Sequence, residues 1–229
     1  MTPPRVPARA ATSSLCPVAD LDRYDREVSP WRLPILARVP EHAIVLDVGA
    51  WTGAIGDWLI HHRGAMVDGL ELESDAAAET RGYRRLIVGS VEDAAIQSEF
   101  GPHYDAILFL DVLEHLVHPE QVLRAARAWL RPGGVVLCSI PNVAHWRVRL
   151  SLLRGRFDYE DSGLLDRTHL RWFTRETARE LVRQSGYRIS WEDAVVPQPP
   201  RVKVPQRLLR PEFFGYQFFY EGVQPARSA

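Results

Sequence analysis

The fold of this chain is decided by the stretch Ile44-Val45-Leu46-Asp47-Val48-Gly49-Ala50-Trp51-Thr52-Gly53. A short apolar run ends at Asp47 and enters a glycine-containing loop, and residues 54–62 then have the pattern of a helix. A buried strand, a tight turn and a helix start bring backbone N–H groups to a small nucleoside ligand in α/β proteins. A second apolar run ends in Glu71, about 20 residues after the loop, where a carboxylate can accept both hydroxyls of a ribose.

From residue 43 onward, expected strands alternate with expected helices. The strands are expected at 43–48, 66–71, 85–88, 105–110, 133–140, 187–194 and 213–220, and the helices at 54–62, 74–82, 91–98, 119–130 and 174–185. Nearly continuous apolar strands, such as 106–110, indicate a parallel sheet that is covered on both faces. Residues 1–18 are expected to form a flexible arm, and 19–229 a single domain with an insertion at about 141–173. Ligands of such sheets lie at the carboxyl ends of the strands.

The composition is that of a globular protein. The chain has 229 residues, of which 46% are hydrophobic, and its net charge is −1. These values argue against disorder and against charge-driven binding to nucleic acid or to a membrane surface. The two cysteines, Cys16 and Cys138, suit a reducing compartment. Because we see no apolar run near 18 residues and no signal peptide, we expect a cytoplasmic protein without a membrane span.

The loop after Asp47 distinguishes between two kinds of nucleoside ligand. A dinucleotide loop of the form G-x-G-x-x-G would need glycine at position 51, where this chain has Trp51. S-adenosylmethionine has no phosphate and carries a cationic sulfonium and an ammonium group. A carboxylate at the strand end, here Asp47, suits those cations better than it suits a phosphate. The residues therefore favour S-adenosylmethionine.

Five motifs follow one another in an order that resembles the class I S-adenosylmethionine-dependent methyltransferases, over about residues 40–195. They are Val45-Leu46-Asp47-Val48-Gly49 with Gly53, Gly69-Leu70-Glu71, Tyr104-Asp105-Ala106-Ile107, Asp111-Val112-Leu113-Glu114-His115-Leu116 and Leu130-Arg131-Pro132-Gly133-Gly134. The resemblance implies a Rossmann-like, doubly wound sheet of seven strands, mostly parallel with an antiparallel last strand. It also implies S-adenosylmethionine as cofactor and S-adenosylhomocysteine as product.

The resemblance implies a set of cofactor-binding residues. They are Asp47, Gly49, Ala50, Trp51, Gly53, Glu71, Leu72, Ser90, Val91, Glu92, Leu110 and Asp111. The family loop usually reads Gly-x-Gly-x-Gly, so Trp51 is a departure that either crowds the methionine tail or turns outward. The usual adenine-side aspartate is Ser90 here, and Glu92 or Asp93 is expected to take its place.

The acceptor side is predicted from the insertion and from the segment after the fourth strand. His169, Asp166 and His115 are the candidate catalytic residues, with a histidine as base and Asp166 orienting the imidazole of His169. The candidate substrate-binding residues are His145, Arg147, Arg167 and Tyr24. The cluster Asp111, Glu114, His115 and His118 could hold a metal, but loop ordering or acid/base chemistry is favoured, and no metal site is predicted.

The function expected from these features is O-methylation of a small polar acceptor, such as a sugar, a sugar nucleotide or a natural-product intermediate. The stretch 141–169 resembles bacterial methyltransferases that are associated with glycosyltransferases for surface polysaccharides. The first half resembles the MetW group, which leaves open a partner or regulatory protein that binds S-adenosylmethionine without strong turnover. A homodimer is compatible with the sequence, and a dinucleotide oxidoreductase is the third alternative.

Overall fold

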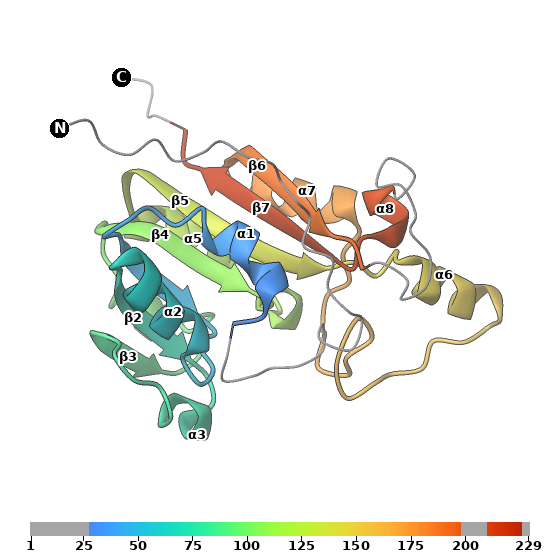
Figure 1. The fold of residues 1–229 in the computed structure, drawn as a ribbon, viewed down its shortest axis with the longest axis horizontal. Coiled ribbons are helices and arrows are strands. Elements are labelled where there is room, and N and C mark those ends of the chain that lie inside the picture. Colours follow the sequence, from blue (N-terminus) through green and yellow to red (C-terminus); the bar gives the residue numbers. More distant parts are fainter. Residues whose placement is uncertain (1–27, 198–209, 226–229) are drawn as a thin grey trace.

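The computed structural model describes residues 28–197 and 210–225. Its centre is a seven-stranded sheet in the order β3-β2-β1-β4-β5-β7-β6 (Figure 1). The strands are β1 (Ile44–Val48), β2 (Met66–Glu71), β3 (Arg85–Val88), β4 (Tyr104–Leu110), β5 (Leu130–Pro141), β6 (Arg188–Val195) and β7 (Gln217–Val223). The helices are η2 (Pro30–Arg32), α1 (Leu33–Leu36), α2 (Ala54–Arg63), α3 (Ser74–Ala77), α4 (Ala94–Gln97), η3 (Leu113–His115), α5 (Pro119–Trp129), α6 (Trp146–Leu153), α7 (Arg175–Gln184) and α8 (Pro211–Phe214).

The strand order creates a switch point between β1 and β4. The chain runs outward from β1 to β2 and β3, and then returns to place β4 against the other side of β1. These strands and β5 are parallel, whereas β7 lies antiparallel between β5 and β6. The predicted mostly parallel sheet with an antiparallel last strand is therefore confirmed. In doubly wound sheets the switch point opens a crevice at the carboxyl ends of the strands.

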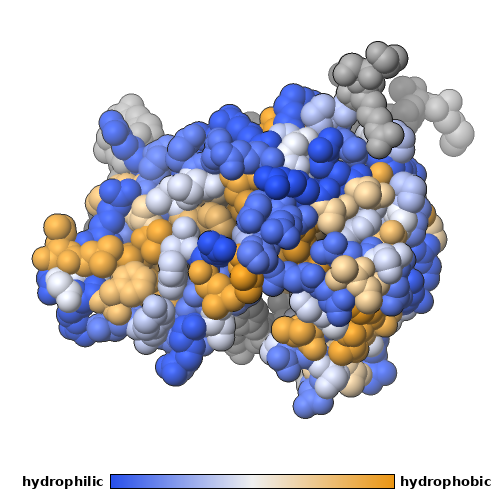
Figure 2. Space-filling view, turned by 180° about the vertical axis from the view of Figure 1, so that it is seen from behind, coloured by the Kyte–Doolittle hydropathy of each residue, from blue (hydrophilic) through white to orange (hydrophobic). Residues whose placement is uncertain are grey.

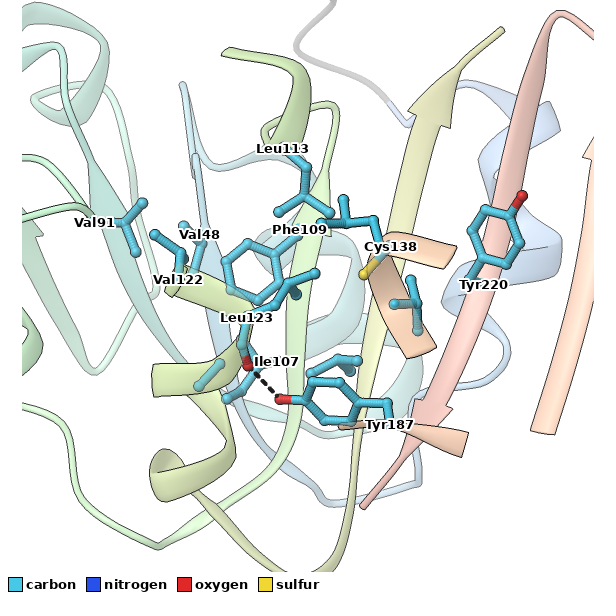
Figure 3. Close-up of a cluster of buried hydrophobic side chains, with 14 of the residues drawn as sticks. Val48, Val91, Ile107, Phe109, Leu113, Val122, Leu123, Cys138, Tyr187 and Tyr220 are labelled. Atoms are coloured by element: carbon cyan, nitrogen blue, oxygen red, sulfur yellow. Dashed lines mark hydrogen bonds between the residues drawn. The ribbon is translucent and has the colours of Figure 1, made fainter. Parts of the chain in front are cut away.

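Helices cover both faces of the sheet, and each face has its own core. Every residue of β4 is buried, and its side chains alternate between the two faces. Ile107 and Phe109 point to the core under α5 and α7, where the Tyr187 hydroxyl donates a hydrogen bond to the Leu123 carbonyl at 2.9 Å (Figure 3). Ala106 and Leu108 face the second core, under α1 and α2. This two-sided burial explains why the strands read as continuous apolar runs.

Three expected elements differ in extent. The helices expected at 74–82 and 91–98 are single turns, α3 and α4. The last strand was expected at 213–220, but β7 begins only at Gln217, because Pro211 starts the short helix α8, where a first-turn proline costs no hydrogen bond. The predicted arm at 1–18 lies outside the described residues.

Helix α6 stands apart from the body of the sheet (Figure 1). Of its side chains only Val148 is buried, and Leu153 is 83% exposed. Seen from behind, apolar side chains gather at this end of the molecule (Figure 2). None of the helices in 28–197 and 210–225 is long and apolar enough to cross a membrane.

Candidate active site

A cavity of about 630 Å³ opens at the switch point, at the carboxyl ends of β1, β2 and β4. Its wall is formed by the β1–α2 loop, the ends of β2 and β4, the loop after β3, the segment before α1 and part of the 164–170 loop. These wall residues are Val28, Ser29, Arg32, Val48, Gly49, Ala50, Trp51, Thr52, Ala54, Ile55, Leu70, Glu71, Leu72, Glu73, Gly89, Ser90, Val91, Glu92, Leu110, Asp111, Val112, His115, Leu116, Asp166 and Thr168. The volume is that of a pocket for a nucleoside-sized ligand.

The β1–α2 loop bends through three residues in the left-handed region. Gly49 has φ 75°, Trp51 φ 48° and Gly53 φ 87°. A Cβ on Gly49 would lie 2.5 Å from the Val112 methyl, so only glycine fits there. For Trp51, the left-handed conformation costs about 1–2 kcal/mol. Trp51 is 48% exposed and forms part of the wall, and the cavity remains open beside it.

Glu71 joins this loop to the turn after β2. One carboxylate oxygen accepts the Trp51 backbone N–H at 2.6 Å, and the other accepts the Glu73 N–H at 2.9 Å. An ionised carboxylate offers about four lone-pair sites, so two remain for further donors. The side chain is buried yet lies in the cavity wall, where a pair of ribose hydroxyls could donate to it.

Asp47 lies behind the loop. It is buried and is absent from the cavity wall, and its carboxylate accepts a 2.5 Å hydrogen bond from the Tyr83 hydroxyl. That hydroxyl in turn accepts the Gly56 N–H at 3.1 Å. Burial raises the pKa of Asp47 to about 6, although the Tyr83 hydrogen bond opposes the rise. The observed contacts of Asp47 therefore tie β1 to the start of α2.

On the side of β3, Ser90, Val91 and Glu92 all contribute to the wall. The Glu92 carboxylate accepts backbone N–H groups from Val117 at 3.2 Å and from His118 at 2.7 Å. Asp93, the other expected adenine-side acid, instead caps α4 by accepting the Ala95 N–H. Of the two acids, only Glu92 therefore belongs to the cavity.

Asp111 lies at the end of β4 and is held from three sides. Its carboxylate accepts hydrogen bonds from Ser139 at 2.5 Å and from the Gln217 amide, and pairs with Arg32 at 2.5 Å. Asp111 has φ 61°, which turns the chain from β4 into η3. Arg32 brings a guanidinium from the segment before α1 into the cavity wall, where it could bind a carboxylate of a ligand.

The acceptor side brings Glu114, His115 and His169 together. One ligand atom from each lies within 4.8 Å of the other two. The rings of His115 and His169 meet edge-on with centroids 4.8 Å apart. Asp166 was expected to orient His169, but its Oδ1 accepts the Thr168 hydroxyl at 2.6 Å and the Thr168 N–H at 2.7 Å. The structure therefore corrects this detail: the side chain of Asp166 holds Thr168.

Burial decides the protonation of this group. It lowers the pKa of His169 to about 4, with a smaller contribution from His115, so the ring is neutral at pH 7. Burial also raises the pKa of Glu114 well above its ordinary value, and Asp111 adds to the rise. A neutral imidazole with so low a pKa is a weak general base.

A family model described as a methyltransferase domain matches residues 21–190. The chain belongs to this methyltransferase family. The expected membership of the class I S-adenosylmethionine-dependent methyltransferases is confirmed. The fold agrees, since a SAM-dependent methyltransferase from Archaeoglobus fulgidus superimposes with a TM-score of 0.62 at 13% identity, over 84% of this chain and 89% of the other. Phosphoethanolamine N-methyltransferase 2 from Haemonchus contortus also gives 0.62, at 17% identity over 88% of this chain and 55% of the other.

Among curated proteins, the methyltransferase is similar to ubiquinone biosynthesis O-methyltransferases. The one from Alkalilimnicola ehrlichii is 30% identical over 129 residues, or 51% of this chain and 50% of the relative. The one from Azoarcus is 28% identical over 157 residues, or 62% of this chain and 66% of the relative. The match thus spans about half to two thirds of the length of these relatives.

Most of the predicted cofactor residues of the methyltransferase lie in the cavity wall; Asp47 and Gly53 do not. His115 and Asp166 are in the same wall, while His169 and Arg167 line a neighbouring hollow of about 510 Å³. His145 and Arg147 line neither space. His145 is buried against Tyr216, and Arg147 is exposed on α6. Tyr24 lies outside the described residues.

Two contributors to the site were missed by the sequence reasoning. Arg32 lies in a segment that carries no family motif, and only its place in the fold brings it to Asp111. Tyr83 is separated from Asp47 by 36 residues, and no spacing rule connects them. Thr168 was not singled out in the sequence either, because its link between His115 and Asp166 forms only in the folded chain.

Proposed function

We propose that this protein transfers a methyl group from S-adenosylmethionine to a hydroxyl oxygen of a small polar acceptor. The cavity at the switch point carries this proposal, because it places Glu71 and Asp111 on either side of β1. Glu71 has acceptor sites left for a ribose. Arg32 and Asp111 offer one positive and one negative group to the amino-acid tail of the cofactor.

The preference for oxygen as acceptor is supported by the curated relatives, which are O-methyltransferases. When bound between Glu71 and Arg32, S-adenosylmethionine would supply the methyl group: the carbon would bond to the acceptor oxygen as its bond to sulfur breaks, the electron pair would stay on sulfur, and the hydroxyl proton would pass to solvent water. The chain's part is to hold the acceptor in line with that bond. Alignment of this kind can supply up to about 7–11 kcal/mol.

The three predicted catalytic groups are kept as positioning groups around the acceptor. His115 and Asp166 lie in the wall of the cofactor cavity, and His169 lines the adjoining hollow. Because the pKa of His169 is lowered to about 4, we do not assign it the acceptor proton. The sugar, sugar nucleotide and natural-product acceptors expected from the sequence are retained as candidates beside intermediates of ubiquinone biosynthesis, which the names of the relatives suggest.

The test is a calorimetric titration of the full chain with S-adenosylmethionine, S-adenosylhomocysteine and NAD, followed by transfer of a labelled methyl group. We expect both sulfur nucleosides to bind and NAD not to bind. The substitution Glu71→Gln should weaken the binding of S-adenosylmethionine at least about tenfold, because hydrogen bonds to a charged group contribute about 1.5–3 kcal/mol. The matched control is Glu41→Gln, whose side chain pairs with Arg63 on the surface.

The acceptor panel contains phenols with neighbouring hydroxyls, sugars and sugar nucleotides. S-adenosylhomocysteine should form in equal amount to the methylated product with one of these classes. Failure of S-adenosylmethionine to bind would remove the methyl donor and with it the proposal. Binding without turnover of any class would contradict the enzymatic proposal and favour the MetW-like regulatory alternative.

A further inference from the structure

The hollow of about 510 Å³ beside the cofactor cavity combines flat rings with polar groups. It is lined by Tyr159, Arg167, His169, Leu170 and Trp172. Small-molecule sites usually enclose about 300–1,000 Å³ and combine aromatic side chains with a few polar groups. The hydroxyl, guanidinium and imidazole groups among these five side chains make the hollow better suited to a polar ligand with a flat ring than to an apolar chain.

The 164–170 loop separates the hollow from the cofactor cavity and contributes residues to both. Asp166 and Thr168 line the cavity, whereas Arg167 and His169 line the hollow. The ring of His169 also meets the ring of His115, in the cavity wall, edge-on with centroids 4.8 Å apart. A ligand in the hollow therefore lies against the same loop as a ligand in the cavity.

This loop is fixed to the segment after β4. The backbone N–H groups of Leu170 and Arg171 donate to the Glu114 carbonyl at 2.8 and 3.0 Å. The Arg171 guanidinium donates to the Val117 carbonyl at 3.1 Å. The hollow is therefore formed before a ligand enters, which lowers the entropy cost of binding.

The aromatic rings in and behind the hollow are arranged around Trp172. Phe157 meets it at 80° and 5.4 Å, Tyr159 at 46° and 6.4 Å, and His169 at 69° and 5.5 Å. None of these pairs is stacked face to face, and Tyr159 is 58% exposed, so ring surface is left for a planar ligand. Nucleic-acid bases stack on such rings whatever their identity, because every base has a π-face.

Arg167 supplies a positive group beside these rings. Its guanidinium pairs with Asp161 at 2.5 Å, and the two side chains are 62% and 90% exposed. Because such surface pairs contribute only about 0–1 kcal/mol, the guanidinium can exchange Asp161 for a phosphate, whose oxygens it matches in pairs. His169 is neutral, and its Nδ1 has no partner among the described residues, so it offers a hydrogen bond to a hydroxyl.

We propose that the hollow binds the nucleotide part of a nucleotide-activated sugar, with the base against Tyr159 and Trp172 and the diphosphate at Arg167. This inference rests on the proposed function and narrows its acceptor to a sugar nucleotide. The sugar is joined to the other end of the diphosphate. It extends toward His169 and the cofactor cavity, where one of its hydroxyls can meet the methyl group.

The experiment uses the full chain saturated with S-adenosylhomocysteine, so that the cofactor cavity is occupied. It is titrated calorimetrically with uridine diphosphate (UDP), uridine and pyrophosphate. We expect UDP to bind, and uridine and pyrophosphate to bind at least tenfold more weakly, because each supplies only one half of the contacts.

Two exposed side chains test the two halves of the site. Tyr159→Ala should weaken UDP at least about fivefold through lost stacking, whereas Tyr159→Phe keeps the ring and should keep the affinity. Arg167→Gln should weaken UDP at least about tenfold through the lost charged hydrogen bonds. Arg156→Gln is the matched control, because Arg156 forms the same kind of exposed pair, with Asp158 at 2.6 Å, but lines neither space.

Each protein is also titrated with S-adenosylhomocysteine, which reports whether the fold and the cofactor cavity are intact. If the wild type binds S-adenosylhomocysteine but not UDP, the nucleotide site is overturned while the proposed function stands. If UDP binds and is lost in the two variants but neither sulfur nucleoside binds, the proposed function fails alone. UDP affinity that is unchanged in both variants, or binding of 3,4-dihydroxybenzoate in place of UDP, would overturn the nucleotide site.

Discussion

At the scale of single residues, Asp47 makes a pH-dependent contribution to stability. Its pKa is raised from 3.8 to about 6 by burial, so the folded state holds a proton between these values that the unfolded state has lost. The folded protein is therefore favoured as pH falls through 6 toward 4, and above pH 6 it carries a buried charge. That charge costs at most about 3 kcal/mol. We expect Asp47→Asn to raise stability by about 1–3 kcal/mol at pH 7.5 and to change it little at pH 4.

Denaturant unfolding of both proteins between pH 4 and pH 8 measures this difference. Asp68, in β2, is the contrasting control. Hydrogen bonds from Arg84 and Tyr104 outweigh burial and hold its pKa below the ordinary value. Asp68→Asn should therefore destabilise the protein by a similar amount throughout this pH range. A constant effect of Asp47→Asn over the range would contradict the assigned cause.

Residue roles were predictable from sequence where a strand end fixes them. Glu71 and Asp111 follow apolar runs, and parallel strands bring such ends to one edge of the sheet. Asp47 also follows such a run, yet it turns away from the cavity, because Tyr83 supplies its hydrogen bond from a distant part of the chain. The position of Trp51 in the cavity wall depends on its left-handed backbone, which no pattern of residue types specifies.

At the scale of elements, the segment formed by η2 and α1 closes one side of the cavity. Trp31 stacks on Phe219 of β7 with ring centroids 6.2 Å apart, and this contact places Arg32 against Asp111. We expect Arg32→Ala to weaken the binding of S-adenosylmethionine about tenfold, because a carboxylate of the ligand would lose a charged hydrogen bond. Calorimetric titration of the purified variant measures the change.

Arg38→Ala is the control within the same segment. Arg38 forms a 2.6 Å ion pair with Glu221 of β7 and is absent from the cavity wall. The Arg38→Ala variant should leave the affinity for S-adenosylmethionine unchanged, even if it lowers the midpoint of thermal unfolding. If both variants weakened binding equally, the effect would lie in the docking of the segment and not in the guanidinium of Arg32.

The helices and strands could be predicted from the sequence where a local pattern of residues marks their ends. The strands from β1 to β4 match their expected ranges closely, because an apolar run bounded by turn residues marks each one. Helices α3 and α4 are shorter than expected, since the polar residues 79–81 with Gly82 after them, and the loop at 89–93, give no apolar face to extend. The sequence could not predict that residues 30–36 close one side of the cavity, because their position depends on packing against β7.

At the scale of the whole molecule, the cofactor cavity joins parts of the chain that are far apart in sequence. Its wall draws on residues 28–32, on the loops after β1, β2, β3 and β4, and on the 164–170 loop. A ligand bound there contacts only the folded state, so it stabilises the entire domain. At a concentration of one hundred times its dissociation constant, it contributes about 2.7 kcal/mol.

For a chain of 229 residues, that free energy corresponds to a rise in the unfolding midpoint of about 5–10 °C. We expect S-adenosylmethionine and S-adenosylhomocysteine to produce this rise in a thermal-unfolding experiment, and NAD at the same concentration to produce none. The rise should grow with the logarithm of ligand concentration, because binding and folding are linked by mass action. Equal shifts from NAD would contradict this prediction, because they would show that the cavity does not distinguish the sulfur nucleosides from a ligand that carries a diphosphate.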